Sequence, residues 1–207
     1  MASLPTIETL ISLATQMGEA VLPYCGKEAD TQGQDLHTTA DRLSEEIITS
    51  HIKRHFPDHL ILAEEAAQEL KEAEYVWIID PVDGTMNFTK GIPLWAISIG
   101  FRLKGEMVLA VVQNPLLSEM FTAEKGKGAN LNGQRISVSG KTDFKRAVVA
   151  ADSNATVLAQ ENIERLAKIN PEVRTVRVLG STALALAWVA CGKLDAFFHN
   201  VHTPYDV

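Results

Sequence analysis

A run of apolar residues ends abruptly in two acids in the stretch WIIDPVDGTMNF, residues 77–88. The proline favours an extended backbone at Asp80, while Gly84 permits a sharp turn into a helix that we expect to start at Thr85. Asp80, at the end of a strand, and Asp83, just beyond it, can therefore converge. Two ionised carboxylates held close together repel, unless a cation lies between them or one holds a proton. The stretch indicates either a metal site or an ordinary turn whose acids cap a helix.

Oxygen ligands in an acidic pocket suit Mg²⁺ or Mn²⁺ better than zinc. Glu64 and Glu65 follow a neighbouring apolar run, and one of them could supply the further ligand that a pair of metals requires. Backbone N–H groups from Gly84 to Met86, if they open a helix, would face an anion held by the same metals. A metal pair beside a helix N-terminus predicts a phosphate site.

Two helices and two short strands must position these acids. Apolar residues at helical spacing predict helices over residues 7–21 and from Thr38 to residue 56. Asp41 falls in the first turn of the second helix, where an acid also has a purely structural use. The runs LILA (60–63) and YVWII (75–79) are too short for helices and suit buried strands.

The rest of the chain predicts an antiparallel sheet followed by an α/β half. Long strands alternate from residue 95 to 125, with large residues on one face and small ones on the other, and Asn132-Gly133 is a hairpin signal. After Val148, strands at 148–152, 175–179 and 195–199 alternate with helices at 157–169 and 182–191. We therefore expect two tightly packed subdomains, residues 1–140 and 141–207, with a cleft between them.

Composition excludes several classes of protein. The chain has 207 residues, 46% of them hydrophobic, without an apolar run of membrane-spanning length, so we expect a cytoplasmic protein with no membrane partner. Nineteen scattered basic residues against 26 acidic ones give a net charge of −7, which argues against nucleic acid as a partner. Cys25 and Cys191 lie in unlike surroundings, and we expect neither a disulfide nor a sulfur-ligated metal.

The segment DPVDGTMNF, residues 80–88, resembles the signature of the inositol monophosphatase family of magnesium-dependent sugar phosphatases. The resemblance extends over essentially the whole chain, through DLHTTAD at 35–41, AEE at 63–65, GKGA at 126–129 and PYDV at 204–207. It implies a layered α/β/α/β/α sandwich, usually a homodimer, and a small phosphorylated polyol or sugar as substrate.

Matched position by position, the resemblance also implies a set of site residues. Two or three Mg²⁺ ions, or Mn²⁺, would be held by Glu64, Asp80, the Val82 carbonyl, Asp83 and Asp206. Gly84 and Thr85 are the implied phosphate contacts. Asp41, acting through the Thr85 hydroxyl, and Glu64 are the implied catalytic residues. The implied reaction is in-line displacement by a metal-activated water, without a phosphoenzyme.

Substrate identity is the point at which this sequence departs from the family pattern. His199 stands where inositol-selective members carry a glutamate, although it also suits a plain strand-end residue. Ser181, with its neighbours Gly180 and Thr182, is a further candidate contact for substrate hydroxyls. Inositol 1-phosphate or a related polyol or sugar phosphate is therefore one expectation. Fructose 1,6-bisphosphate, histidinol phosphate or a nucleotide-type phosphate is the alternative, and a non-catalytic regulatory or binding protein on the same fold is a third.

The chain stops at Val207, directly after the last implied ligand, whereas members of the family continue into a further helix and strands. The resemblance therefore implies that this sequence is a fragment, a truncated variant or part of a longer protein.

Overall fold

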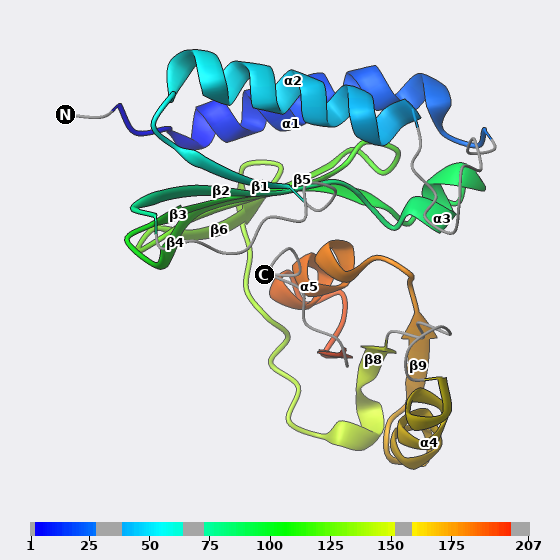
Figure 1. The fold of residues 1–207 in the computed structure, drawn as a ribbon. Helices are drawn as coiled ribbons and strands as arrows, with labels where there is room; N and C mark the ends of the chain where they lie inside the picture. The colour runs from blue at the N-terminus through cyan, green and yellow to red at the C-terminus, as the bar shows by residue number, and fades with distance from the viewer. Residues whose placement is uncertain (1–2, 28–38, 64–72, 152–158, 200–207) are drawn as a thin grey trace.

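The computed structural model describes residues 3–27, 39–63, 73–151 and 159–199, and these residues form five layers (Figure 1). Helices α1 (Ile7–Val21) and α2 (Thr39–His55) cover one face of a seven-stranded sheet. Helix α5 (Thr182–Ala190) lies below the other face, followed by a three-stranded sheet and then α4 (Ala159–Ile169). This order confirms the expected layered α/β sandwich. The division at residue 140 stays a prediction.

The larger sheet has its strands in sequence order, β1 to β7. Strands β1 and β2 pair in parallel and all later neighbours are antiparallel. The strands are β1 (Leu60–Ala63), β2 (Tyr75–Asp83), β3 (Ala96–Leu103), β4 (Glu106–Asn114), β5 (Glu119–Glu124), β6 (Gly128–Leu131) and β7 (Gln134–Arg135). The expected hairpin is present, since Asn132 and Gly133 both adopt positive φ, 50° and 78°.

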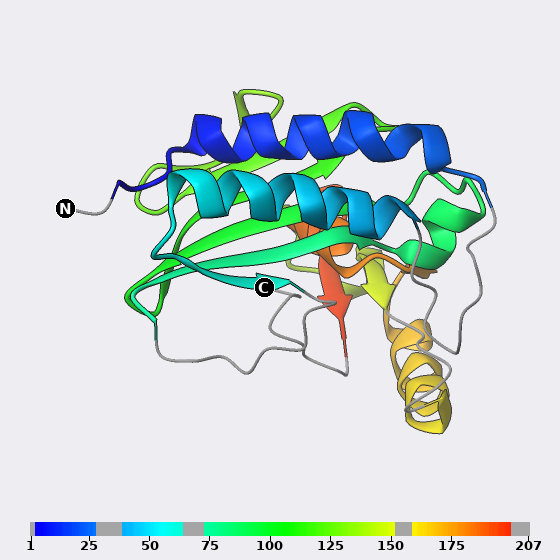
Figure 2. The same cartoon turned by 45° about the horizontal axis from the view of Figure 1, so that its top comes forward.

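The main core lies between this sheet and the helix pair, which runs along the strands (Figure 2). The face of β3 predicted to carry large residues does so, and Ile97, Ile99 and Phe101 are almost fully buried there. Helix α1 contributes Leu10 and Met17, both without exposed surface, from the apolar side of its 3.6-residue repeat. Burial of each such side chain stabilises the fold by about 1.5–3 kcal/mol.

The second sheet is parallel, in the order β10-β8-β9. Its strands are β8 (Val148–Ala151), β9 (Thr175–Val178) and β10 (Ala196–Phe198). Val149 and Ala150 of the central strand have no exposed surface, as expected of a strand covered on both faces. The strands and helices predicted for this half are confirmed, although the predicted start of α4 at residue 157 lies outside the described residues.

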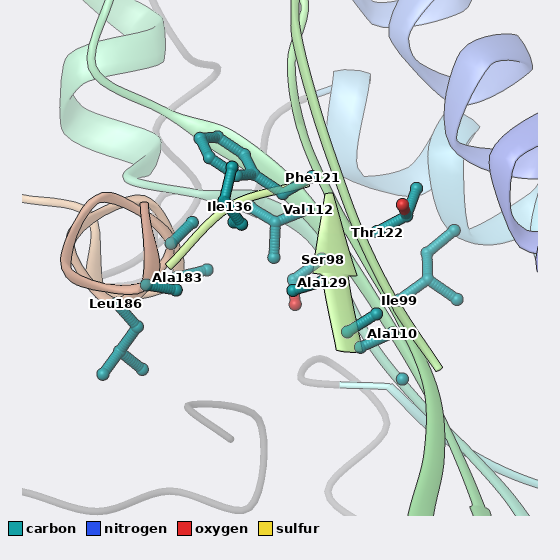
Figure 3. Close-up of a pocket in the computed structure, with 14 residues that line it drawn as sticks. Ser98, Ile99, Ala110, Val112, Phe121, Thr122, Ala129, Ile136, Ala183 and Leu186 are labelled. Carbon is teal, nitrogen blue, oxygen red and sulfur yellow. The ribbon is translucent and has the colours of Figure 1, made fainter. Parts of the chain in front are cut away.

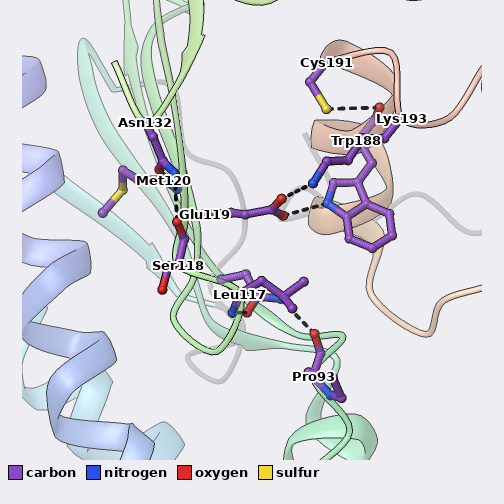
Figure 4. Close-up of polar contacts among 10 residues, drawn as sticks. Pro93, Leu117, Ser118, Glu119, Met120, Asn132, Trp188, Cys191 and Lys193 are labelled. Atoms are coloured by element: carbon purple, nitrogen blue, oxygen red, sulfur yellow. Dashed lines mark hydrogen bonds and ion pairs between the residues drawn. The ribbon is translucent and has the colours of Figure 1, made fainter. Parts of the chain in front are cut away.

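Glu119 of β5 joins the larger sheet to the end of α5 (Figure 4). Its carboxylate accepts a hydrogen bond from Trp188 Nε1 at 2.9 Å and forms an ion pair with Lys193. The Lys193 ammonium also lies 5.1 Å from the centre of the Trp188 ring. Because Glu119 is only 8% exposed, this contact places a charged group between two layers of the molecule.

Among the described residues, the remaining helices are the short α3 (Thr85–Thr89) and three 3₁₀ helices at Leu22–Tyr24, Phe144–Arg146 and Asn170–Glu172. The thiols of Cys25 and Cys191 are free. Within the described ranges, no helix combines the length and apolar character needed to cross a membrane.

Candidate active site at the end of β2

Strand β2 continues through Asp83, whereas the sequence predicted that it would end near Asp80. The pairing with β3 shifts between these two acids, because Asp80 lies opposite Ser98 and Asp83 lies opposite Ala96. Proline at position 81 has no N–H to donate to the ladder, which explains the irregularity. The bulge keeps both acids paired with the sheet.

Two local hydrogen bonds order the bulge. Asp80 is 9% exposed, and its Oδ1 accepts a hydrogen bond from the Val82 N–H at 3.0 Å. The Thr85 hydroxyl donates to the Val82 carbonyl oxygen at 3.2 Å. A carbonyl oxygen has two lone pairs, so this bond leaves Val82 able to accept one further partner.

Glycine is required at position 84, directly before the short helix α3 (Thr85–Thr89). Gly84 is the N-cap of this helix and adopts φ 93° and ψ 42°. A Cβ atom there would lie 2.9 Å from the Gly180 carbonyl oxygen and 3.0 Å from the Leu94 carbonyl oxygen. Both the positive φ and the close backbone approach exclude a side chain. The turn after β2 is therefore packed directly against the segment that precedes α5.

Asp83 caps α5 from across the chain. Its carboxylate accepts hydrogen bonds from the N–H groups of Thr182 at 3.0 Å and Ala183 at 2.9 Å, and from the Ser181 hydroxyl. Burial nevertheless raises the pKa of Asp83 to about 6, while the bonds from Ser181, Thr182 and Ala183 act in the opposite direction. A cation beside this carboxylate would favour its charged form.

The first N–H groups of α5 have hydrogen-bond partners within the chain. The first two N–H groups serve Asp83, and the Leu184 N–H donates to Ser181 Oγ at 3.3 Å. Ser181 itself is 5% exposed. A substrate contact of Ser181 stays a prediction.

The remaining candidates lie on separate elements. Asp41 is 6% exposed in the first turn of α2, and its pairing with Thr85 stays a prediction, since the described Thr85 hydroxyl bond goes to Val82. His199 follows β10, with its ring stacked on Phe197 at 5.8 Å between centroids. Glu64 and Asp206, like Glu65 and Thr38, lie outside the described residues. In the parts of the chain that are described, no three His, Cys, Asp or Glu side chains form a metal-binding cluster.

Sequence reasoning missed the role of Asn87. Its side-chain Nδ2 donates to the Leu94 carbonyl oxygen at 2.6 Å and to the Leu179 carbonyl oxygen at 2.7 Å. The second of these bonds spans 92 residues of sequence, which no local pattern reveals. The only local signal was an asparagine beside the acidic turn.

A separate apolar groove lies between the larger sheet and α5 (Figure 3). Small side chains of β3 and β4, such as Ser98 and Ala110, form one wall, and Ala183 and Leu186 form the other. Its lining includes no ionisable side chain, so it does not suit a phosphate group.

Comparisons with known proteins agree with this fold. The model of the inositol monophosphatase family matches residues 4–207. Inositol monophosphatase 3 of Solanum lycopersicum is 35% identical over 213 residues, which cover 97% of this chain and 79% of that protein. The Nus factor SuhB of Escherichia coli (strain K12) is 38% identical over 183 residues, covering 86% of this chain and 68% of that protein. The crystal structure of the extragenic suppressor protein SuhB from Bartonella henselae superposes with a TM-score of 0.89 at 32% identity, covering 97% and 80% of the two chains.

The layered fold and these relatives define a phosphoric monoester hydrolase of the α/β class. The chain belongs to the inositol monophosphatase family.

Proposed function

We propose that this chain hydrolyses a small phosphate monoester, inositol 1-phosphate or a related polyol or sugar phosphate, in a Mg²⁺-dependent reaction. The observation that carries the proposal is the bulged end of β2, where two acids flank a backbone carbonyl beside the N-terminus of α5. The names of the relatives support the substrate class.

The donor set fits a hard divalent cation, since it consists of carboxylates and a carbonyl. Asp80, the Val82 carbonyl and Asp83 would hold the metals, together with Glu64 and Asp206. The raised pKa of Asp83 agrees with this role, because a partly buried carboxylate is better accommodated when a cation neutralises it. Two or three Mg²⁺ ions, or Mn²⁺ in their place, would supply an activated water and offset the charge of the leaving oxygen.

The remaining groups would guide the phosphate and the proton. Backbone N–H groups at Gly84 and Thr85 hold phosphate oxygens, while Asp41 takes up the proton of the attacking water through the Thr85 hydroxyl. Water attacks phosphorus in line with the leaving alkoxide, so no bond from phosphorus to the protein forms. Ser181 and His199 contact the polyol. The histidine favours a substrate range broader than that of a glutamate-bearing, inositol-selective enzyme.

A second candidate is a regulatory or binding role on the same fold, favoured by the likeness to the Escherichia coli protein named as a Nus factor. The net charge of −7 argues against direct binding to nucleic acid by this chain. We further propose a homodimer in the cytoplasm, which light scattering of the purified protein and fractionation would test.

Phosphate release from a panel of monoesters, with and without Mg²⁺, tests the proposal. The panel includes inositol 1-phosphate, fructose 1,6-bisphosphate, histidinol phosphate and a nucleoside monophosphate. We expect metal-dependent turnover, greatest for a polyol or sugar phosphate. A well-folded protein that releases no phosphate from any of them supports the regulatory candidate instead.

A further inference from the structure

Two backbone segments from different layers meet at the side chain of Asn87. One is the stretch that leads into β3, represented by Leu94, and the other is the stretch Leu179–Gly180 that leads into α5. The two hydrogen bonds from Asn87 Nδ2, 2.6 and 2.7 Å long, use both N–H bonds of the amide. Asn87 therefore fastens the start of α5 to the larger sheet.

The surrounding backbone is shaped to admit this side chain. Gly180 adopts φ 71°, and a Cβ atom there would lie 3.0 Å from Asn87 Nδ2. A Cβ atom at Gly84, in the turn after β2, would lie 3.2 Å from Ser181 Cβ. Glycines on both sides of the junction thus allow the turn after β2 and the start of α5 to approach closely.

Asp83 depends on the same junction. Its carboxylate is oriented by the N–H groups of Thr182 and Ala183, which follow directly after the Leu179–Gly180 segment that Asn87 holds. We propose that Asn87 is a positioning residue, which fixes the start of α5 so that Asp83 presents its remaining lone pairs to the metal. The part of this inference that concerns metal rests on the proposed function.

The chemistry of the contact makes asparagine specific. Alanine would leave two carbonyl oxygens without their donor, and aspartate would place a carboxylate against both. Groups that orient a metal ligand without touching the metal typically change affinity by 10–100-fold. We therefore expect a measurable effect on metal binding from a residue that does not bind the metal.

The test compares Asn87→Ala with Asn132→Ala in two measurements. Asn132 also makes two bonds to backbone, with Met120 N–H and the Ser118 carbonyl, both 2.9 Å, but in the hairpin of the larger sheet (Figure 4). Alanine at its positive φ adds strain, so this control also perturbs the fold, but at a hairpin away from α5. The measurements are hydrogen exchange of the Thr182 and Ala183 amides in metal-free protein, and calorimetric Mn²⁺ binding.

We expect Asn87→Ala to lose protection of both amides and to bind Mn²⁺ about 10-fold more weakly, with Asn132→Ala close to wild type in both. Equal effects of the two variants, or none from Asn87→Ala, would overturn the positioning role. If Asn87→Ala does not fold, Asn87→Ser, which keeps one hydrogen-bond donor in a smaller side chain, takes its place. If the proposed function is wrong, the wild-type protein will neither bind Mn²⁺ nor release phosphate. Amide exchange in metal-free protein still tests the positioning role of Asn87 in that case.

Discussion

Asp83 shows at the scale of a single residue how one side chain joins a site to the fold. It accepts three hydrogen bonds from the start of α5, and its pKa is still raised to about 6 because burial outweighs them. The sequence predicted that Asp83 would lie just beyond the end of a buried strand. It did not predict the partners of that acid, which lie 98 to 100 residues further along the chain.

Thr85→Ala tests the proton route. The hydroxyl donates to the Val82 carbonyl at 3.2 Å, and alanine removes it together with the γ-methyl group. We expect kcat to fall about 100-fold, with little change in KM. A factor of about 100 is the lower end of the rate enhancement that general acid–base catalysis usually supplies. Thr85→Ser keeps the hydroxyl and should retain most of the turnover. A change confined to KM would count against the relay.

His199→Glu tests substrate selection at the end of β10. A carboxylate accepts hydroxyl hydrogen bonds more strongly than a neutral imidazole, so activity on inositol 1-phosphate should rise about tenfold relative to other monoesters. The measurement is the ratio of kcat/KM values across the substrate panel. Unchanged ratios would place His199 outside the pocket.

At the scale of elements, most helices and strands follow from periodicity, because each has one apolar face or is buried on both faces. The exception is the end of β2, where Asp-Pro-x-Asp-Gly reads as a turn and instead continues the strand through a bulge. Pairing with β3 supplies the missing information, and such pairing has no local signature. The caps of α5 were hidden for the same reason.

Asp195 connects the residues before β8 to the turn before β10, and it makes the stability of this sheet depend on pH. Its carboxylate accepts hydrogen bonds from Lys141 Nζ at 2.8 Å, Ser139 Oγ at 2.5 Å and the Val148 N–H at 2.7 Å. The Lys141 bond is the main cause that lowers the pKa of Asp195 from 3.8 to about 2. The resulting stabilisation is present above about pH 4 and is lost as the pH falls towards 2.

Asp195→Asn should therefore lower the free energy of unfolding by about 1–2 kcal/mol at pH 7. This is less than the full pKa shift implies, because Lys141 is half exposed and solvent screens its charge. Urea unfolding at pH 7, 4 and 2.5 measures the difference from wild type, which should shrink at the lowest pH. A difference independent of pH would show that the charge of Asp195 is unimportant.

At the scale of the whole molecule, polar contacts join layers whose packing the sequence predicted without identifying the contacts between them. Glu119, 8% exposed, lies between β5 and α5 with Trp188 and Lys193 as partners. Sequence patterns locate buried apolar faces well, but they give no indication of which charged residue crosses from one layer to the next. The Asn87 contacts belong to the same class.

Lys193→Met removes the cation from Glu119 and should destabilise the protein by about 1–3 kcal/mol, because a mostly buried carboxylate loses its partner. Lys125→Met breaks the exposed pair with Glu106 and is the matched control, with an expected cost below about 1 kcal/mol. Urea unfolding curves provide both values. Equal costs would show that burial of Glu119 adds nothing to the interaction.

The most direct test of the central claim is phosphate release from inositol 1-phosphate as Mg²⁺ is titrated into wild type and Asp83→Asn. The amide keeps the shape of the side chain but not the charge that would hold the cation. Hydrogen exchange of the Thr182 and Ala183 amides in Asp83→Asn checks that the start of α5 remains folded. We predict that its turnover at saturating Mg²⁺ falls more than about 100-fold below wild type, a loss of several kcal/mol of metal-dependent stabilisation. Turnover near that of wild type would contradict the assignment of Asp83 as a metal ligand.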